Sequence, residues 1–239
     1  MEIFVKNLHL SYEQIGEGPD ILMLHGWGQN IAMMMPLAKK LAPKYKITIL
    51  DLPGFGASEE PTSGLTIYEY TSIIEEATQK LHLKNPILIG HSFGGRIAII
   101  YASRNQVNKV VLFGAPCVRD RTPKASEKIL KSLKKIPGTK TLVAIAKNYL
   151  GSTDYKNATP IMREILVNTI NEDLSACAKK ITAPTLLIWG TLDTAAPLDD
   201  AKKLEQLLAN GGLVEIPNCT HYAYLEALDY VTTILKNFL

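Results

Sequence analysis

Six short, mostly apolar runs constrain the fold of this 239-residue chain more than any other feature. Runs of this length are typical of β-strands buried on both faces, because a strand with one solvated face would alternate apolar with polar residues. Between them lie stretches such as residues 66–83, where apolar residues recur at intervals of three and four, a spacing typical of helices packed on one face. Strands that alternate with helices predict an α/β fold, with a mostly parallel central sheet flanked by helices. The six runs span residues 21–24, 46–50, 86–90, 109–114, 185–190 and 213–217.

Two segments depart from this alternation. The first 15 residues alternate apolar and polar side chains, which predicts an antiparallel hairpin at an edge of the sheet. Residues 115–184 separate two consecutive predicted strands by far more chain than one crossover helix needs. We therefore expect a helical cap, or lid, over 115–184, inserted before the penultimate strand of a core formed by residues 1–114 and 185–239. Residues 118–164 hold 11 Lys or Arg and 4 Asp or Glu, a net charge of +7, which suits either attraction of an anionic substrate or a solvated helical face.

Charge and composition narrow the classes of partner. The formal net charge of +3, with no long basic run, gives no indication of nucleic-acid binding. The first residues lack the apolar segment of a signal peptide, and no apolar run approaches the roughly 20 residues that cross a bilayer, so we expect no stable membrane insertion. Three widely spaced cysteines, Cys117, Cys177 and Cys219, show no pairing pattern, which favours reduced thiols and a cytoplasmic location. We expect a monomer or a homodimer.

The stretch GHSFG at residues 90–94 places a serine between a predicted strand and a predicted helix. A strand that turns sharply into a helix presents the central side chain at the apex of the bend, and the flanking glycines leave room for the turn. The helix that begins here directs its amide N–H groups and the positive end of its dipole toward an anion formed at Ser92. An ordinary serine N-cap would not require glycine on both sides. The pattern therefore predicts that Ser92 is a nucleophile.

A serine hydroxyl needs a base to remove its proton. Of the five histidines, His221 follows the last predicted strand, which places it at the carboxyl edge of the sheet together with Ser92. Asp193 follows the penultimate strand and supplies a carboxylate that would fix the tautomer of the base. Asp199 and Asp200 are rivals, but their stretch is typical of a helix start, where acidic residues favour the helix. The sequence therefore predicts a catalytic triad of Ser92, Asp193 and His221.

Five motifs, in the order in which they occur in the chain, resemble those of the α/β-hydrolase fold family, and together they extend along nearly the whole chain. The resemblance implies that family's fold, with residues 115–184 as its cap. It also implies that the backbone amides of Trp27 and Phe93 form the oxyanion hole, and that hydrolysis needs neither a cofactor nor a metal. The motifs are LHGWG (24–28), DLPGFGAS (51–58), GHSFGG (90–95), WGTLDTAAP (189–197) and NCTH (218–221).

The first two motifs are similar to those of small bacterial carboxylesterases, including the pimeloyl-ester carboxylesterase of biotin synthesis. This similarity implies a serine hydrolase that cleaves small-molecule carboxylic esters of small to medium acyl chains through an acyl-enzyme. We expect Trp27, Met33 and Arg96 to contact the substrate. Arg96 lies four residues after Ser92, as in a menaquinone-pathway lyase of this fold, so a lyase or C–C hydrolase with an anionic substrate stays open. A non-enzymatic ligand receptor or signalling partner that retains the triad is the third alternative.

Overall fold

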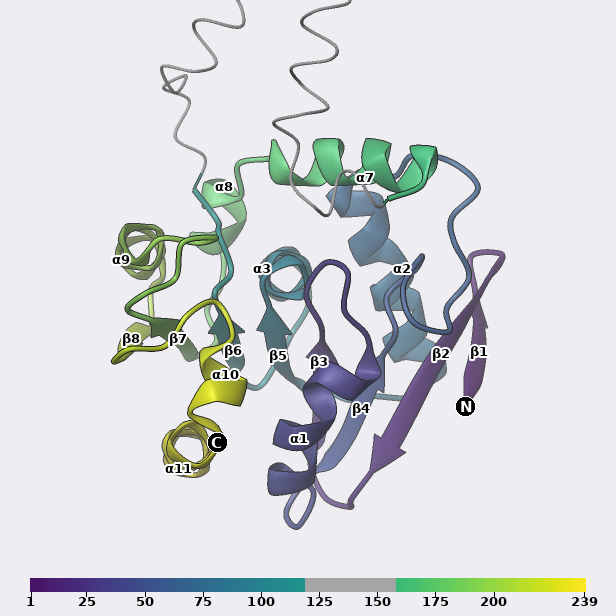
Figure 1. Cartoon of the computed structure of the whole chain (residues 1–239). Coiled ribbons are helices and arrows are strands. Elements are labelled where there is room, and N and C mark those ends of the chain that lie inside the picture. The colour runs from purple at the N-terminus through teal and green to yellow at the C-terminus, as the bar shows by residue number, and fades with distance from the viewer. Residues whose placement is uncertain (119–157) are drawn as a thin grey trace, which may run out of the picture.

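In the part of the chain that the computed structural model describes, residues 1–118 and 158–239, an eight-stranded sheet forms the centre (Figure 1). The strands lie in the order β1-β2-β4-β3-β5-β6-β7-β8. Neighbours from β4 across to β8 are parallel, whereas β2 runs antiparallel to both β1 and β4. The predicted edge hairpin is thus confirmed. The strands span β1 Glu2–Val5, β2 Leu8–Ile15, β3 Asp20–Leu24, β4 Lys46–Leu50, β5 Ile87–His91, β6 Val110–Phe113, β7 Thr185–Gly190 and β8 Gly211–Ile216.

Helices cover both faces of this sheet (Figure 1). Apolar residues of α2, α3 and α9 pack into the core on one face, and those of α1, α10 and α11 pack on the other. This layering confirms the predicted α/β fold class. The helices of the described residues span α1 Ile31–Leu41, α2 Ile67–Lys80, α3 Phe93–Arg104, α7 Pro160–Ile170, α8 Ser175–Ala178, α9 Leu198–Leu207, α10 Ala223–Glu226 and α11 Leu228–Phe238.

All six apolar runs form strands, and five of these are buried on both faces as predicted. The exception is β8, most of whose residues are half-buried or exposed. β8 is the last strand of the sheet and pairs only with β7 among the described strands, so it is an edge strand in this part of the chain. The expectation of two buried faces was wrong for this strand because sequence does not show which strand ends the sheet.

Local side-chain chemistry sets where α2 begins. The Thr66 hydroxyl accepts a hydrogen bond from the Glu69 amide, and the Glu69 carboxylate accepts one from the Thr66 amide. This reciprocal pair satisfies N–H groups that have no partner within the helix. The helix accordingly spans Ile67–Lys80, inside the predicted range of 66–83.

The helices α7 and α8 lie between β6 and β7 in the chain, at the place predicted for the cap. In Figure 1, α7 crosses above α2 and α3, near the carboxyl ends of the central strands. Residues 119–157, and with them most of the positively charged stretch, lie outside the described residues. The division into a core and a cap over 115–184 therefore stays a prediction.

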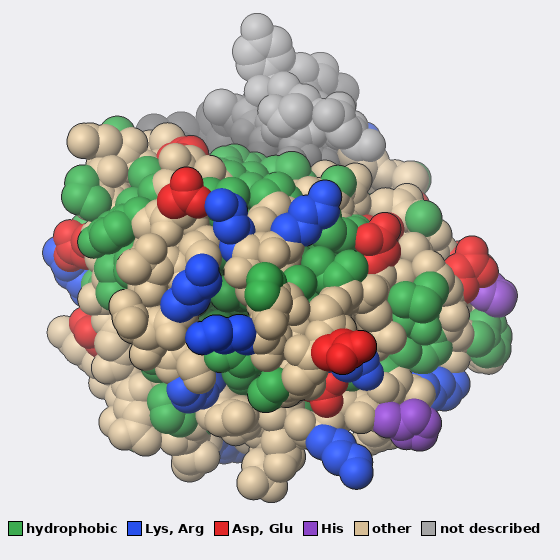
Figure 2. All heavy atoms as spheres, turned by 90° about the horizontal axis from the view of Figure 1, so that it is seen from below, with side chains coloured by type: hydrophobic (Ala, Val, Ile, Leu, Met, Phe, Trp, Pro, Cys, Tyr) green, Lys and Arg blue, Asp and Glu red, His purple; other side chains and the backbone are tan. Residues whose placement is uncertain are grey.

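The two ends of the sheet present different surfaces. The arrowheads of β3, β5 and β6 point toward α7 (Figure 1), so the loops after these strands face that helix. Figure 2 shows the opposite face, where lysine and arginine side chains gather near the middle, with acidic and apolar side chains around them.

No helix in the described ranges is long and apolar enough to span a bilayer. Of the three free cysteines, Cys117 and Cys219 are buried and Cys177 is half-buried.

Candidate active site

Ser92 occupies a sharp turn between β5 and α3. Its backbone has a φ of +49°, in the left-handed region that non-glycine residues rarely adopt, and its amide donates to the Phe113 carbonyl at 2.8 Å. Gly94 packs so closely under the turn that a Cβ there would collide with the Leu24 carbonyl oxygen, and a Cβ at Gly90 would lie 2.6 Å from the Cα of Gly95. Both glycines are therefore needed for the strand and the helix to meet at this angle. The strained conformation persists because packing on both sides holds it.

His221 and Asp193 form a hydrogen-bonded pair. The imidazole Nδ1 lies 2.7 Å from Asp193 Oδ2, and the side chains are 16% and 1% exposed. The other carboxylate oxygen, Oδ1, accepts hydrogen bonds from the amides of Ala195 and Ala196 at 2.9 and 2.8 Å. The buried carboxylate is thus held by two backbone donors, and it orients the imidazole so that Nε2 is left for chemistry. Gly114, with a φ of +51°, makes room, because a Cβ there would lie 2.9 Å from the His221 ring.

The loop that carries His221 is braced by two residues that the sequence analysis missed. His91 Nε2 lies 2.9 Å from the His221 carbonyl oxygen, and burial lowers the pKa of His91 to about 3, so the neutral ring donates this hydrogen bond. The Glu226 carboxylate accepts a hydrogen bond from the Thr220 amide at 2.6 Å and another from the Thr220 hydroxyl. No short-range motif marks either contact. His91 and His221 are 130 positions apart in the chain.

The loop after β3 is held just as firmly. The Gln29 side-chain oxygen accepts a hydrogen bond from the Gly26 backbone amide at 2.9 Å, and the Gln29 backbone amide donates one to the Gly26 carbonyl at 3.2 Å. His25 Nδ1 donates to the same carbonyl at 2.7 Å, while its Nε2 accepts from the Leu52 amide at 2.9 Å. Burial lowers the pKa of His25 to about 4, which keeps the ring neutral and able to do both. This bracing fixes the position of the next residue, Trp27.

The two residues whose amides are expected to bind an oxyanion, Trp27 and Phe93, line the same cavity as Ser92. Phe93 is the first residue of α3, where N–H groups have no partner within the helix, and Trp27 follows the braced loop. In the described part of the chain, neither amide donates a hydrogen bond to another backbone or side-chain group. The side chains of Trp27 and Phe93 touch, with ring centroids 5.2 Å apart and an interplanar angle of 72°. This contact packs the loop after β3 against the start of α3.

One cavity of about 510 Å³ brings most of the predicted site residues together. Its size lies within the range of small-molecule sites. Ser92, His221, Trp27, Phe93 and Arg96 all line it, and Asp193 lies directly behind His221. The remaining lining residues are Gln29, His91, Pro116, Leu166, Thr169, Ile170, Thr194, Ala195, Thr220 and Tyr222.

Arg96 lines this cavity, but its guanidinium contacts backbone carbonyl groups. Nη1 donates to the Pro116 carbonyl at 2.6 Å, and Nη2 donates to the carbonyls of Thr169 and Glu172 at 2.8 and 2.7 Å. The side chain is buried. These contacts tie α3 to the end of α7, where the last carbonyl groups of a helix need donors and favour a positive charge.

The structure does not bring Met33 together with the other site residues. It is half-buried on α1 and does not line the cavity beside Ser92, while its neighbour Met34 is fully buried in the core. Asp199 and Asp200, the rivals of Asp193, lie in the first turn of α9 as their sequence context predicts. The carboxylate in contact with His221 is that of Asp193.

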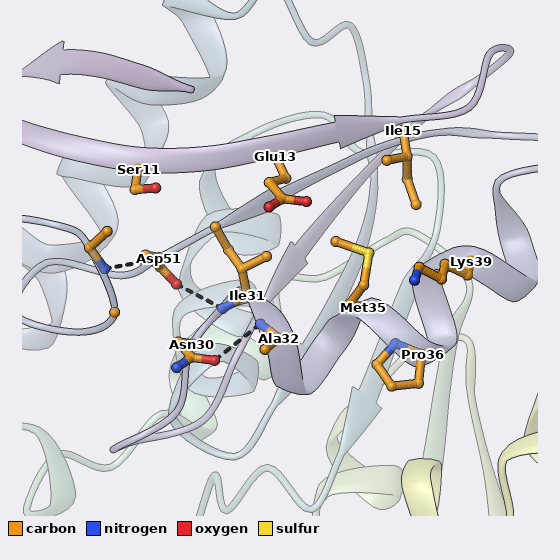
Figure 3. A pocket seen from close by; sticks show the side chains of 12 residues that line it. Ser11, Glu13, Ile15, Asn30, Ile31, Ala32, Met35, Pro36, Lys39 and Asp51 are labelled. Carbon is orange, nitrogen blue, oxygen red and sulfur yellow. Dashed lines mark hydrogen bonds between the residues drawn. The ribbon is translucent and has the colours of Figure 1, made fainter.

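A second hollow of the described residues is an open groove of about 1040 Å³ between β2 and α1 (Figure 3). Its lining contains no histidine that could serve as a base. The Asp51 carboxylate, at one end, accepts hydrogen bonds from the amides of Ile31 and Ala57 at 2.7 and 2.8 Å, so it holds two loops together. No cluster of three or more His, Cys, Asp or Glu side chains suited to a metal ion occurs in the described ranges.

Known proteins match this chain over most of its length. The sequence model of a family described as alpha/beta hydrolase fold matches residues 19–148. The AB hydrolase superfamily protein YisY of Bacillus subtilis (strain 168) is 29% identical, with 98% of this chain and 96% of that protein covered. The pimeloyl-[acyl-carrier protein] methyl ester esterase of Nitrosospira multiformis is 26% identical, with 95% and 97% covered.

Solved structures agree with this fold. The esterase EaEST from Exiguobacterium antarcticum superposes with a TM-score of 0.79 at 24% identity, over 99% of this chain and 98% of that one. The bromoperoxidase from Bacillus anthracis superposes with a TM-score of 0.80 at 22% identity, over 100% and 99%. Because the family match covers more than half of the chain, this chain belongs to the alpha/beta hydrolase fold family and is an esterase-like hydrolase.

Proposed function

We propose that this protein is a serine esterase in which Ser92 is the nucleophile, His221 the base and Asp193 the residue that orients the base. The observation that carries the proposal is the 2.7 Å pair of His221 Nδ1 and Asp193 Oδ2, beside a cavity that Ser92 lines from a strained turn. A buried carboxylate, an imidazole with one free nitrogen and a serine at a helix start are the parts that acyl transfer requires. Ester hydrolysis in general follows from the family and its esterase relatives.

The reaction proceeds in two halves. The Ser92 hydroxyl oxygen attacks the ester carbonyl carbon while His221 Nε2 takes its proton, and Asp193 stabilises the imidazolium that forms. The amides of Trp27 and Phe93 donate to the oxyanion of the tetrahedral intermediate, and removing one such donor typically slows turnover about 100- to 1000-fold. The intermediate collapses as His221 protonates the departing alcohol. Water, deprotonated by His221, then attacks the acyl-enzyme and releases the acid and Ser92.

We infer that the substrates are small-molecule esters of small to medium acyl chains. The cavity beside Ser92 is about 510 Å³ and includes Leu166 and Ile170 in its lining, which suits an apolar chain. The relatives named as pimeloyl-[acyl-carrier protein] methyl ester esterases are consistent with an acyl chain of this size. The alternative of a lyase that binds an anion through Arg96 is less favoured, because its guanidinium already donates to three carbonyl groups. A cytoplasmic location remains part of the proposal.

The nucleophile is tested with a fluorophosphonate probe and a panel of p-nitrophenyl esters of increasing chain length. Ser92→Ala should abolish labelling and lower turnover by about 10⁵- to 10⁶-fold, with the folded protein retained. Peptide mapping of the labelled wild-type protein should identify Ser92. Labelling at another serine, or turnover that persists in Ser92→Ala, would exclude this mechanism.

A further inference from the structure

We propose that Trp27 is a specificity-determining residue, whose indole ring separates the cavity beside Ser92 from a second cavity and so limits the acyl chain. Shortening the side chain should join the two cavities into one acyl site. The inference rests on the proposed esterase function, since it defines where the acyl chain of the ester lies. Trp27 is thus given a side-chain role that is separate from the role of its backbone amide.

The second cavity has a volume of about 330 Å³, within the range of small-molecule sites. In the described part of the chain, its lining shares a single residue with that of the cavity beside Ser92, and this residue is Trp27. The two spaces therefore meet at this side chain. The full lining is Trp27, Gly28, Gly54, Phe55, Glu60, Ala158, Thr159 and Met162.

Two aromatic contacts hold the indole in place between the cavities. Phe55, which lines the second cavity, has its ring centroid 4.9 Å from that of Trp27 at an interplanar angle of 78°. Phe93, which lines the cavity beside Ser92, has its centroid 5.2 Å away at 72°. Edge-to-face pairs of this geometry are attractive, because the positive edge of one ring meets the negative face of the other. The centroids of Phe55 and Phe93 are themselves 6.4 Å apart, so the three rings form one aromatic cluster that holds the indole.

The helix α7 covers both cavities. Met162 lines the second cavity and Leu166 lines the one beside Ser92. Residues four positions apart lie on the same side of a helix, so the two cavities follow one another along α7. Met162 also packs over Gly54, which has a φ of +81° and where a Cβ would lie 2.5 Å from the Met162 sulfur. The end of the second cavity near the first turn of α7 is therefore closely packed.

Glu60 gives the second cavity its chemical preference. Among the described residues of that lining it is the one ionisable side chain, and its carboxylate accepts a hydrogen bond from the Thr159 hydroxyl at 2.8 Å. Phe55, Ala158 and Met162 supply apolar surface. A carboxylate here repels an anionic group and accepts hydrogen bonds from hydroxyl or ammonium groups. The second cavity should therefore take an alkyl tail whose end is neutral or cationic.

The partition is tested by Trp27→Leu, which keeps the backbone amide. The measurement is the ratio of kcat/KM for p-nitrophenyl decanoate to that for the butyrate, so that any loss of overall rate cancels. Burial of each further methylene favours binding about four-fold, so two or three newly buried groups should raise this ratio at least about ten-fold. An unchanged ratio in a folded Trp27→Leu protein would overturn the inference.

Filling the second cavity should reverse the gain. Adding Ala158→Trp to Trp27→Leu places a large side chain in the second cavity only, and the decanoate-to-butyrate ratio should return toward the wild-type value. Ala32→Trp in the same background is the matched control, because Ala32 is exposed on α1 and lines neither cavity. Equal ratios in the two double variants would contradict the assignment of the new space to the second cavity.

The preference for a neutral or cationic group at the end of the acyl chain is tested in the Trp27→Leu background. Esters of a 10-aminodecanoyl chain should be turned over faster than those of a 9-carboxynonanoyl chain. Replacing Glu60 by Gln should narrow this difference about two- to five-fold, as expected for a partly exposed charge pair. A difference that Glu60→Gln leaves unaltered would exclude Glu60 as its cause.

A binding measurement separates this inference from the proposed function. Two proteins are compared, Ser92→Ala and the double variant Ser92→Ala with Trp27→Leu. Decanol should raise the Tm of the double variant more than that of the single variant, whereas butanol should raise both Tm values equally. If the wild-type protein hydrolysed no ester while decanol showed this difference, the proposed function would be wrong and the partition right. Ester turnover dependent on Ser92, without any effect of Trp27→Leu on decanol binding or on chain length, would refute the partition alone.

Discussion

At the scale of single residues, the Asp193 carboxylate is the most constrained group of the site. One of its oxygens binds the imidazole of His221 and the other accepts from the amides of Ala195 and Ala196. Its side chain is almost completely buried, so water contributes little to its stabilisation. A negative charge held this rigidly favours a proton on His221 Nδ1, and in the proposed mechanism it would stabilise the imidazolium formed when Ser92 gives up its proton.

Asp193→Asn should lower turnover of p-nitrophenyl butyrate by about 10⁴-fold while leaving the protein folded, because the amide neither carries the charge nor enforces the productive tautomer. Asp199→Asn is the matched control, since Asp199 is exposed in the first turn of α9. It should change turnover by less than about two-fold. A severe loss in Asp199→Asn together with an active Asp193→Asn would show that the wrong carboxylate has been chosen.

At the scale of elements, Arg96 couples two helices that are distant in the chain. It lies one turn after Ser92 on α3, and its guanidinium donates to Thr169 and Glu172 at the end of α7 and to Pro116 after β6. The planar fork of an arginine suits this role, because its five donors point in fixed directions and can reach carbonyl groups that lie apart. This side chain is therefore one of the contacts that position α7 over the two cavities.

Arg96→Met should lower the free energy of unfolding by at least about 2 kcal/mol, because buried carbonyl groups lose a charged donor. The free energy of unfolding of Arg96→Lys should lie between that of Arg96→Met and that of the wild type, since one ammonium cannot span the three carbonyl oxygens. Arg104→Met on the same helix is the control. Arg104 is 39% exposed and lies 3.9 Å from Glu75, so its loss should cost less than about 1 kcal/mol. Urea unfolding monitored by circular dichroism gives all three values, and equal losses at positions 96 and 104 would contradict the argument.

At the scale of the whole molecule, two buried histidines tie stability to pH. Burial lowers the pKa of His25 to about 4 and that of His91 to about 3, whereas both return to about 6.5 in the unfolded chain. Below about pH 6.5 the unfolded chain therefore binds more protons than the folded protein. The stability that the neutral rings contribute is present above this pH and is lost as the pH falls toward 4 and then 3.

Between about pH 6 and pH 4.5, each histidine should remove up to about 1.4 kcal/mol of unfolding free energy per pH unit. Urea unfolding at pH 7 and pH 5 measures this loss. His91→Asn should reduce the pH dependence by about half, even if the variant is less stable at both pH values. His9→Asn, at an exposed position on β2, should leave it unchanged. A wild-type stability equal at the two pH values would refute the linkage.

The sequence by itself predicted the strands and helices and the candidate catalytic residues at their ends. Apolar periodicity, the capping pair of Thr66 and Glu69 and the glycines around Ser92 act over a few neighbouring positions, so they can be interpreted without knowing the rest of the fold. The family resemblance rests on motifs of the same local kind. That the loops of Ser92 and His221 meet was predictable because parallel strands bring their carboxyl ends to one edge.

The tertiary structure alone decided which side chains meet across long separations in the chain. It placed His91 under the His221 loop, turned Arg96 to the end of α7, left Met33 outside the cavity and set Trp27 between two cavities. It also made β8 an edge strand. These outcomes depend on packing among elements that are up to 130 positions apart, and no local pattern of residues encodes them.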